Sequence, residues 1–239
     1  MHQSPICRMR LIENIRITDT ACEDVVVKLR LENLDRKNVL PFTAGQFVVM
    51  GIPGVKNPAP AYFAVASSPY ETRYYEFVVK RGSGMADYLS ELAPGAEIEV
   101  EGPMGKGFDL MPFKKCNVIL MGVGTGISPL RSVWRSIIEE RESYGKVTIY
   151  AGFLTPLHRL LTDELEALSE QHIEVKISLD RTDADWNGPI GYVQDALLAD
   201  HPDPENSVVC LAGMSAMVDA CTETLQNLGF DDSRILLNF

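Results

Sequence analysis

The amino-acid sequence predicts a two-domain fold, an N-terminal antiparallel β-barrel followed by a C-terminal α/β domain with a doubly wound parallel sheet. Short strand-like runs separated by turn residues fill the first half, which indicates the barrel. Apolar strands alternate with helical segments in the second half, which indicates the parallel sheet. The pattern changes near residues 110–113, so we expect the barrel over residues 1–112 and the α/β domain over residues 113–239.

The strands of the first half recur at roughly 10–15-residue spacing, which is typical of an antiparallel barrel. Turns rich in Gly, Pro, Asn and Ser separate them. One short helix over residues 85–92 follows Gly82-Ser-Gly84. The expected strands cover residues 25–31, 46–50, 62–66, 75–80 and 97–101.

Strands and helices alternate regularly through the second half. The expected strands cover residues 118–121, 146–151, 174–179, 208–212 and 234–239. The expected helices cover residues 129–141, 160–169, 192–199 and 215–228. Ligands of such sheets bind at the carboxyl ends of the strands, so we expect the site at the end of the first of these strands.

A glycine-rich turn follows that first strand and leads into a helix. Gly122, Gly124 and Gly126 end the apolar run, and Ser128 and Pro129 open the helical segment. Proline suits the first helical position, and a helix N-terminus reached through glycines presents backbone N–H groups to an anion. The pattern therefore predicts a bound dinucleotide. The alternative is a purely structural turn, because Ile127 stands where the Rossmann fingerprint has its third glycine.

Composition places the chain among globular proteins, with 46% hydrophobic and 23% charged residues. No run reaches the ~18 apolar residues of a membrane helix, and the first residues do not form a signal peptide. We therefore expect a cytoplasmic protein without a membrane span. The five cysteines include no C-x-x-C pair, so we expect no disulfide framework, metal site or iron–sulfur cluster.

The net charge is −11, and such an acidic chain is a poor binder of nucleic acid, so we expect no nucleic-acid partner. A dinucleotide is also an anion, and the field of an acidic protein does not attract it. Its phosphates must therefore be held by local N–H groups and a few cations.

Short motifs occur in a characteristic order along both halves. They are Pro41-Phe-Thr-Ala-Gly45-Gln46-Phe47, Glu101-Gly-Pro-Met-Gly105, Gly122-Val-Gly-Thr-Gly-Ile-Ser-Pro-Leu-Arg131 and Trp186-Asn-Gly-Pro-Ile-Gly191-Tyr-Val. This order resembles the ferredoxin–NADP⁺ reductase (FNR-like) superfamily over nearly the whole chain. More narrowly, the chain looks like a poorly characterised plant branch known as "fruit protein". The resemblance implies a flavin-binding barrel and a pyridine-nucleotide-binding α/β domain.

The resemblance also implies which residues contact the two cofactors. The flavin set is Phe63, Ala64, Val65, Ala66, Val79, Lys80, Arg81, Gly84, Met85, Ala86 and Phe239. The nucleotide set is Gly122, Val123, Gly124, Thr125, Gly126, Ile127, Ser128, Arg131, Ala212, Gly213 and Met214.

Alanine stands at four positions where the superfamily has a polar side chain. Its R-x-Y-S motif falls on Ala61-Tyr62-Phe63-Ala64, which lacks the arginine for a flavin phosphate and the serine near flavin N5. Ala86 and Ala212 replace a hydroxyl near the pyrophosphate and a thiol near the nicotinamide. A lost charge-assisted hydrogen bond costs about 1.5–3 kcal/mol and a neutral one about 1 kcal/mol. The flavin-binding motifs are therefore degenerate, and weaker flavin binding is expected.

Three remaining residues have two interpretations each. Lys80 and Arg81 lie beside the start of the short helix, where either could replace the missing cation or remain a solvated strand-end charge. Phe239 could stack on the flavin or belong to the core of the last strand.

The resemblance implies a flavoprotein oxidoreductase that passes a hydride from NAD(P)H to FAD and electrons to a separate acceptor protein or small molecule. No acid–base side chain is needed for this chemistry, so no catalytic residue is named. The alternative is a flavin-deficient nucleotide-binding, regulatory or electron-transfer subunit of a larger redox assembly. NADH and NADPH both remain open, because His158 and Arg159 could meet a 2′-phosphate or simply lie at an exposed helix start.

Overall fold

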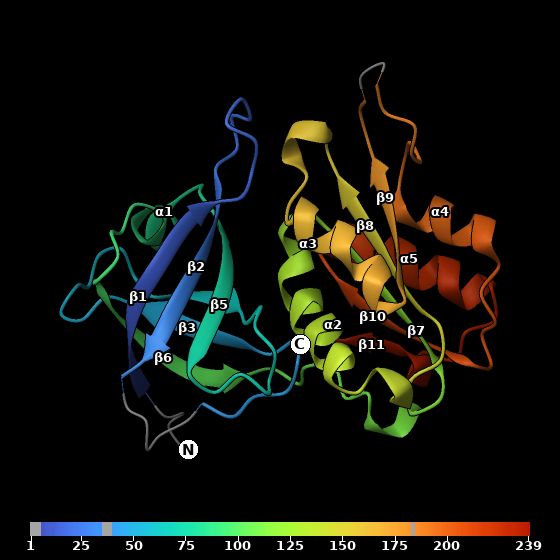
Figure 1. The fold of residues 1–239 in the computed structure, drawn as a ribbon, viewed down its shortest axis with the longest axis horizontal. Helices are drawn as coiled ribbons and strands as arrows, with labels where there is room; N and C mark the ends of the chain where they lie inside the picture. The colour runs from blue at the N-terminus through green and yellow to red at the C-terminus, as the bar shows by residue number, and fades with distance from the viewer. Residues whose placement is uncertain (1–5, 35–39, 183–184) are drawn as a thin grey trace.

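The computed structural model describes residues 6–34, 40–182 and 185–239, which form two domains side by side (Figure 1). The first domain is a six-stranded antiparallel sheet in the order β4-β3-β6-β1-β2-β5. Its elements are β1 (Ile6–Arg16), β2 (Val26–Asn33), β3 (Phe47–Gly51), β4 (Ala61–Ala64), β5 (Tyr74–Lys80), α1 (Gly84–Ser90) and β6 (Glu97–Met104).

The sheet closes into the expected barrel at its two edge strands. A bridge between Val65 and Phe77 joins the chain just after β4 to β5, and the Ala66 N–H donates to the Glu76 carbonyl at 2.8 Å. Closure leaves no free sheet edge at this seam. The barrel interior is filled by fully buried apolar side chains from the surrounding strands, including Met9, Leu29, Val48, Phe77 and Val100.

Strand β1 is a finding that the sequence pattern did not predict. Its buried residues Cys7, Met9 and Leu11 alternate with exposed arginines, as in a strand with one solvated face. A bulge between Leu11 and Glu13 then interrupts the register with β2. The regular alternation is therefore confined to the first six residues of the strand, and the bulge ends it.

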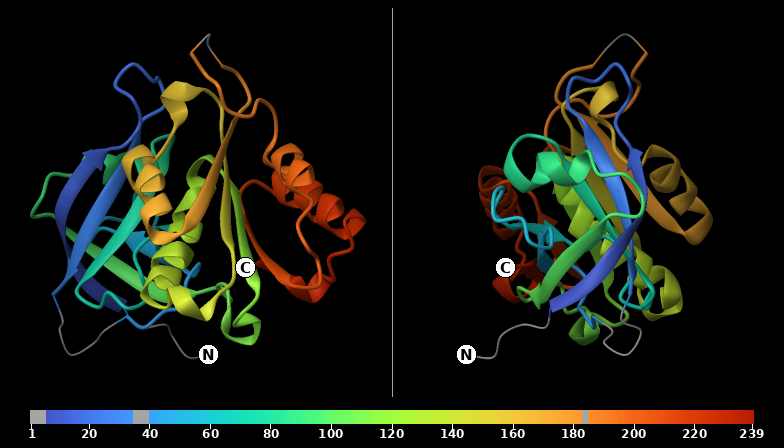
Figure 2. Two further views of the ribbon diagram at one scale, coloured as in Figure 1. Left: turned by 45° about the vertical axis from the view of Figure 1, so that its right-hand side comes forward. Right: turned by 90° about the vertical axis from the view of Figure 1, so that its left-hand side faces the viewer.

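The second domain is a five-stranded parallel sheet in the order β11-β10-β7-β8-β9. Its strands are β7 (Asn117–Val123), β8 (Val147–Phe153), β9 (Ile173–Leu179), β10 (Ser207–Ala212) and β11 (Ile235–Leu237), and its helices are α2 (Ile127–Glu139), α3 (Thr162–Ala167), α4 (Val193–Asp200) and α5 (Ser215–Asn227). Helices α2 and α3 pack on one face of the sheet and α4 and α5 on the other (Figures 1 and 2). The sheet is therefore doubly wound, as predicted.

The strand order reverses direction between β7 and β10. The chain runs outward from β7 to β8 and β9, then returns to place β10 on the opposite side of β7. Loops leaving the carboxyl ends of β7 and β10 diverge to opposite faces, and the crevice between them is where open α/β sheets bind ligands. The C-terminus also lies between the two domains (Figure 1).

Across the described ranges, with residues 1–5, 35–39 and 183–184 left aside, no helix has the length and apolar character needed to span a bilayer. The same part of the chain contains no group of three or more His, Cys, Asp or Glu side chains arranged to hold a metal ion.

Candidate functional site between the two domains

A cleft of about 460 Å³ opens between the barrel and the carboxyl ends of β7 and β10. The barrel contributes Tyr62, Phe63, Ala64, Val78, Val79 and Lys80. The α/β domain contributes Val123, Thr125, Gly126, Ser128, Pro129, Ala212, Gly213, Met214 and Asn238. The structure thus brings together, in one cleft, residues predicted for flavin and residues predicted for nucleotide.

The three turn glycines have different structural roles. A Cβ at Gly126 would lie 2.4 Å from the Ala212 carbonyl oxygen, and one at Gly122 would lie 2.9 Å from the same atom. Gly122 and Gly126 therefore allow the end of β7 to pack directly against the end of β10. Gly124 has φ +52°, and nothing lies within 4 Å of the position of its Cβ. Its backbone is left-handed and open, as a close approach to a ligand requires.

The N-terminus of α2 faces the cleft immediately after this turn. Gly126 precedes the helix, and Ser128 and Pro129 in its first turn line the cleft. That turn carries no acidic side chain, so the positive end of the helix dipole is not neutralised. A 13-residue helix that begins here suits a phosphate group, and the α/β wall therefore fits a dinucleotide.

The barrel wall of the cleft is mostly apolar. Phe63 is half-buried on β4, next to Ala64 and across the cleft from the glycine turn. Tyr62 is 69% exposed, and its ring meets Phe47 edge to face at a centroid distance of 5.6 Å. Such a surface suits the packing of a planar aromatic ring.

Lys80 provides the positive charge of the cleft. Among the described residues that line it, Lys80 alone carries a formal charge, and its ammonium lies 2.5 Å from Asp24. The hydrogen bond from Lys80 lowers the pKa of Asp24, which keeps that carboxylate ionised. Arg81 does not line the cleft and forms an ion pair with Glu91 instead. The structure thus places Lys80, rather than Arg81, where a cofactor phosphate could reach it.

The start of α1 carries a feature that the sequence motifs did not reveal. Gly84 has φ +60° with open space around it, but Asp87 lies in the first helical turn and accepts a hydrogen bond from the Gly82 N–H at 2.7 Å. A carboxylate here opposes the binding of a second anion at the same turn. Met85 is 2% exposed and belongs to the barrel core, and neither it nor Ala86 lines the cleft.

Several other predicted residues lie behind the cleft. Val65, Ala66 and Ile127 are fully buried, and Arg131 is 2% exposed with protein partners on both sides. Gly122 and Gly124 shape the turn but do not line the cleft. Phe239 is 66% exposed beyond the end of β11, so its interpretation as a core residue is wrong.

Asn238 is a cleft residue that sequence reasoning missed. Its side-chain amide donates to the Gly45 carbonyl at 3.0 Å, which fastens the C-terminal segment to the barrel. A lone asparagine near a chain end carries no sequence signal. Tyr62, Val78 and Pro129 were also missed, although each adjoins a predicted residue and could have been found from strand and helix geometry.

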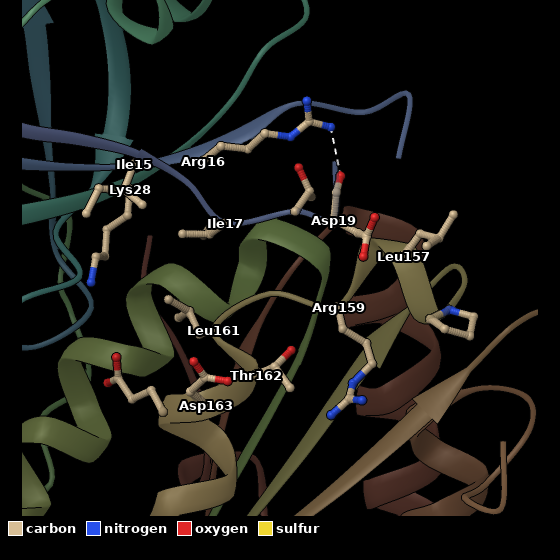
Figure 3. Close-up of a pocket in the computed structure, with 13 residues that line it drawn as sticks. Ile15, Arg16, Ile17, Asp19, Lys28, Leu157, Arg159, Leu161, Thr162 and Asp163 are labelled. Atoms are coloured by element: carbon tan, nitrogen blue, oxygen red, sulfur yellow. Dashed lines mark hydrogen bonds between the residues drawn. The ribbon is translucent and has the colours of Figure 1, made fainter. Parts of the chain in front are cut away.

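A second cavity of about 610 Å³ lies between the end of β1 and the start of α3 (Figure 3). Its lining includes three cations, Arg16, Lys28 and Arg159, together with three carboxylates. Arg16 already donates to the carbonyls of Asp19 and Cys22 at 2.8 and 2.7 Å. Its described lining residues include no glycine turn and no aromatic side chain, so the smaller cleft remains the candidate site.

The two residues considered for a 2′-phosphate are half-buried and already paired. His158 contacts the Thr155 hydroxyl at 2.7 Å and lies 3.6 Å from Asp24. Arg159 forms an ion pair with Glu166 at 3.1 Å. The expectation of an exposed helix start is therefore wrong for both side chains.

One wall of the cleft belongs to the barrel and suits a planar ring. The opposite wall is a glycine turn at the switch point of a parallel sheet. This combination is typical of a two-domain oxidoreductase that binds two dinucleotides. The family profile of the oxidoreductase FAD-binding domain matches residues 13–108, and that of the oxidoreductase NAD-binding domain matches residues 120–223. The chain belongs to the family of ferredoxin–NADP reductase-like oxidoreductases and is an NAD(P)H-dependent flavin oxidoreductase.

Relatives with known names support this assignment. Ferredoxin–NADP reductase B of Sorangium cellulosum is 32% identical over 173 residues, 71% of this chain and 70% of that protein. Sulfhydrogenase 1 subunit gamma of Pyrococcus furiosus is 26% identical over 96% of this chain and 78% of its own length. The cytochrome b5 reductase domain of Ulva prolifera nitrate reductase has the same fold, with a TM-score of 0.80, 19% identity and coverage of 98% and 97%.

Proposed function

We propose that this protein transfers reducing equivalents from NAD(P)H through FAD to a separate electron acceptor. The observation that carries the proposal is the shared cleft, in which Phe63 and Val79 of the barrel oppose Gly126 and Gly213 of the α/β domain. Bound FAD would supply the chemistry, since a flavin accepts a hydride and releases electrons singly or in pairs. The protein itself orients two planar rings and limits water between them.

We assign the flavin to the wall formed by Phe63, Ala64 and Val79, with Lys80 as the cation for its phosphates. The nucleotide is assigned to Val123, Thr125, Gly126 and Ser128 and to the β10 loop, Ala212, Gly213 and Met214. Phe239 stays in the flavin set because its exposed ring is available for stacking. We place the domain boundary after residue 112, within the short 3₁₀ turn Met111–Phe113.

The degenerate motif suggests a mechanism of binding that depends on main-chain and apolar contacts. Ala61, Ala64, Ala86 and Ala212 supply no side-chain hydrogen bond, and Asp87 opposes an anion at the start of α1. The narrower assignment to the plant "fruit protein" branch rests on the sequence resemblance. A cytoplasmic location stays part of this proposal, because none of the five cysteines forms a disulfide, as is usual in reducing compartments.

A second candidate is an electron-transfer subunit of a larger redox assembly. It is favoured by the similarity to sulfhydrogenase 1 subunit gamma, which covers 96% of this chain and is named as a subunit. In this case the electron acceptor would be another subunit rather than a diffusing protein or small molecule.

The decisive experiment is an FAD titration of the purified protein, followed by anaerobic addition of NADH or NADPH while flavin absorbance is recorded. We expect binding of one FAD per chain and bleaching of its absorbance by at least one of the two nucleotides. Colourless protein that ignores excess FAD but still binds a nucleotide would refute the reductase and favour the flavin-deficient subunit.

A further inference from the structure

Helix α2 is bonded to the barrel strand segment that forms the opposite wall of the cleft. The Ser128 hydroxyl donates to the Ala64 carbonyl at 3.2 Å, and Arg131 Nη1 donates to the Ala66 carbonyl at 2.9 Å. The two donors are three residues apart and share one face of the helix. The two acceptors are two residues apart in extended chain, where alternate carbonyls point the same way. The helix and the barrel segment are therefore joined at two points.

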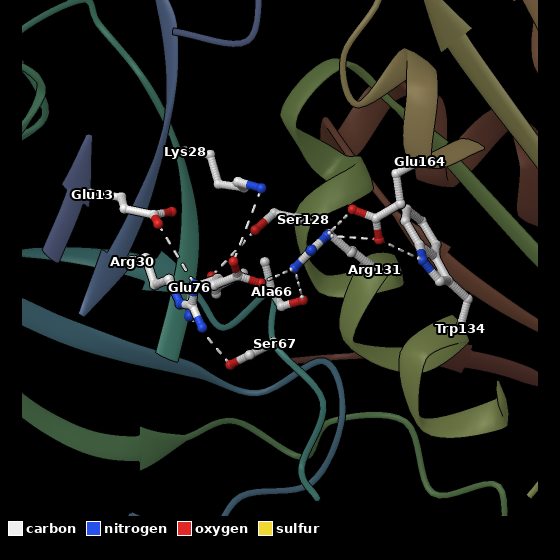
Figure 4. Close-up of polar contacts among 11 residues, drawn as sticks. Glu13, Lys28, Arg30, Ala66, Ser67, Glu76, Ser128, Arg131, Trp134 and Glu164 are labelled. Atoms are coloured by element: carbon white, nitrogen blue, oxygen red, sulfur yellow. Dashed lines mark hydrogen bonds and ion pairs between the residues drawn. The ribbon is translucent and has the colours of Figure 1, made fainter. Parts of the chain in front are cut away.

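Arg131 is held by carboxylates from both domains (Figure 4). Its Nη1 lies 2.7 Å from Glu76 Oε2 on β5, and its Nε lies 3.0 and 2.8 Å from the two oxygens of Glu164 on α3. Glu164 also accepts a hydrogen bond from Trp134 Nε1 at 3.1 Å. The guanidinium is 2% exposed, so it is shielded from competing water and salt.

Two of the three guanidinium nitrogens are thereby committed to protein acceptors. Nη1 is bonded to the barrel, and Nε is bonded within the α/β domain. Arg131 also lies only four residues into α2, and this helix begins directly after the glycine turn. Because a helix is stiff over one turn, fixing Arg131 also fixes the turn relative to the Ala64–Ala66 segment and the neighbouring Phe63.

We propose that Arg131 is a positioning residue that sets the alignment of the two cofactor sites across the cleft, and that it contacts neither cofactor. The proposal rests on the function proposed above. Donor and acceptor rings must meet in a narrow range of distance, and a displacement of about 1 Å can cost about 100-fold in rate. Loosening the contact between Arg131 and the barrel therefore slows hydride transfer while leaving nucleotide binding intact.

The two carboxylates on Arg131 provide a matched pair of variants. Glu76→Gln weakens the contact between domains, and Glu164→Gln weakens the contact within the α/β domain. Each variant neutralises one of the two carboxylates that contact the Arg131 guanidinium and preserves the shape of that side chain. Arg131→Lys is a third variant, which keeps the charge but loses the planar fork that bonds both sides.

The measurement is the rate of flavin reduction at saturating nucleotide under anaerobic conditions, together with the nucleotide Kd and the FAD content. For Glu76→Gln we expect a rate at least about tenfold lower, because of the steep dependence on alignment, with Kd and FAD content unchanged. Glu164→Gln should keep the wild-type reduction rate and show only a lower melting temperature. Arg131→Lys should follow Glu76→Gln if it folds.

A folded Glu76→Gln variant with the wild-type reduction rate overturns the proposal. A raised nucleotide Kd with an unchanged saturated rate also overturns it, because it would assign this cluster to binding. Hydrogen exchange gives a readout that needs no flavin, so it separates failure of this proposal from failure of the reductase function. Glu76→Gln, unlike Glu164→Gln, should speed amide exchange in residues 61–66 and 124–131, and unchanged exchange in both variants counts against the proposal.

Discussion

At the residue scale, the cleft holds one formal charge among its described lining residues and several small apolar side chains. Lys80 is that charge, and Asp24 fixes its ammonium at 2.5 Å. Ala61 lies on β4 opposite Met50, one residue before the exposed Tyr62. The resemblance seen in the sequence implies a cation at this position, and the alanine side chain supplies none. Restoring that cation is a direct test of whether the site binds a flavin phosphate.

We predict that Ala61→Arg strengthens FAD binding by about tenfold or more, because a charge-assisted hydrogen bond contributes about 1.5–3 kcal/mol. Isothermal titration calorimetry with FAD measures the change. The control is Ala61→Gln, which adds a side chain of similar reach without charge. Equal affinity in the two variants would show that no phosphate lies near this position.

At the element scale, the turn between β7 and α2 combines close packing with an open approach. Gly126 packs against the Ala212 carbonyl, whereas Gly124 projects into space that no other residue fills. The same residue type thus serves the stability of the α/β domain at one position and access to the backbone at another. Separate substitutions can distinguish the two roles.

We predict that Gly124→Ala mainly weakens nucleotide binding and that Gly126→Ala mainly weakens the fold. Gly124→Ala should fold, at a cost of about 1–2 kcal/mol for a left-handed alanine, and should raise the nucleotide Kd because its methyl group occupies the open approach. Gly126→Ala should lower the free energy of unfolding by about 1–3 kcal/mol or more, since its methyl group meets backbone that cannot yield.

Denaturant unfolding and nucleotide titration of both variants test this assignment. A Gly124→Ala variant that binds nucleotide as tightly as the wild type would show that the nucleotide does not use the open space beside Gly124. A Gly126→Ala variant of unchanged stability would contradict the packing role.

At the scale of the whole molecule, polar contacts join the two domains at several points. Arg131 bonds to Glu76 and Ala66 on one side of the cleft. Tyr70 of the barrel domain donates a hydrogen bond to Glu140 at the end of α2, and Lys114 binds the same carboxylate. Cofactor sites split between two domains depend on such contacts, because neither wall alone defines the separation of the rings.

Acid should weaken this interface. Burial would raise the pKa of Glu76, but the adjacent Arg131 guanidinium outweighs burial and the net pKa is lowered. A carboxyl group with a lowered pKa in the folded state stabilises the protein above its ordinary pKa of about 4.3 and loses that contribution as pH falls through the lowered value. We therefore expect the contribution of Glu76 to be constant from neutral pH to about pH 5 and to disappear in stronger acid.

The free energy of unfolding of the wild type and of Glu76→Gln, measured from pH 7 to pH 3, tests this expectation. The variant should be less stable at pH 7, and its stability should decline less steeply in acid because it lacks one titrating group. Parallel declines in the two proteins would show that Glu76 does not contribute to the acid sensitivity.

Most helices and strands could be predicted from local patterns, and their expected boundaries differ from the observed ones by a few residues. The expected helix over residues 160–169 ends its regular part at Ala167, and the last strand covers only Ile235–Leu237. Strand β1 was not predicted, although its first six residues alternate before the bulge ends the pattern. At the site, the structure places in the cleft four residues that the sequence indicated, Phe63, Lys80, Val123 and Gly126. The ligand that each of them contacts stays a prediction.

The sequence alone determined the two-domain architecture and the glycine turn, because periodicity and turn chemistry depend on residues that are near one another in the chain. Only the tertiary structure decided which cation faces the cleft, where Asn238 lies and what Arg131 contacts. The partners of Arg131 are 33, 55 and 65 residues away along the chain. Such contacts arise from the docking of two separately patterned domains, and no local pattern records how two surfaces meet.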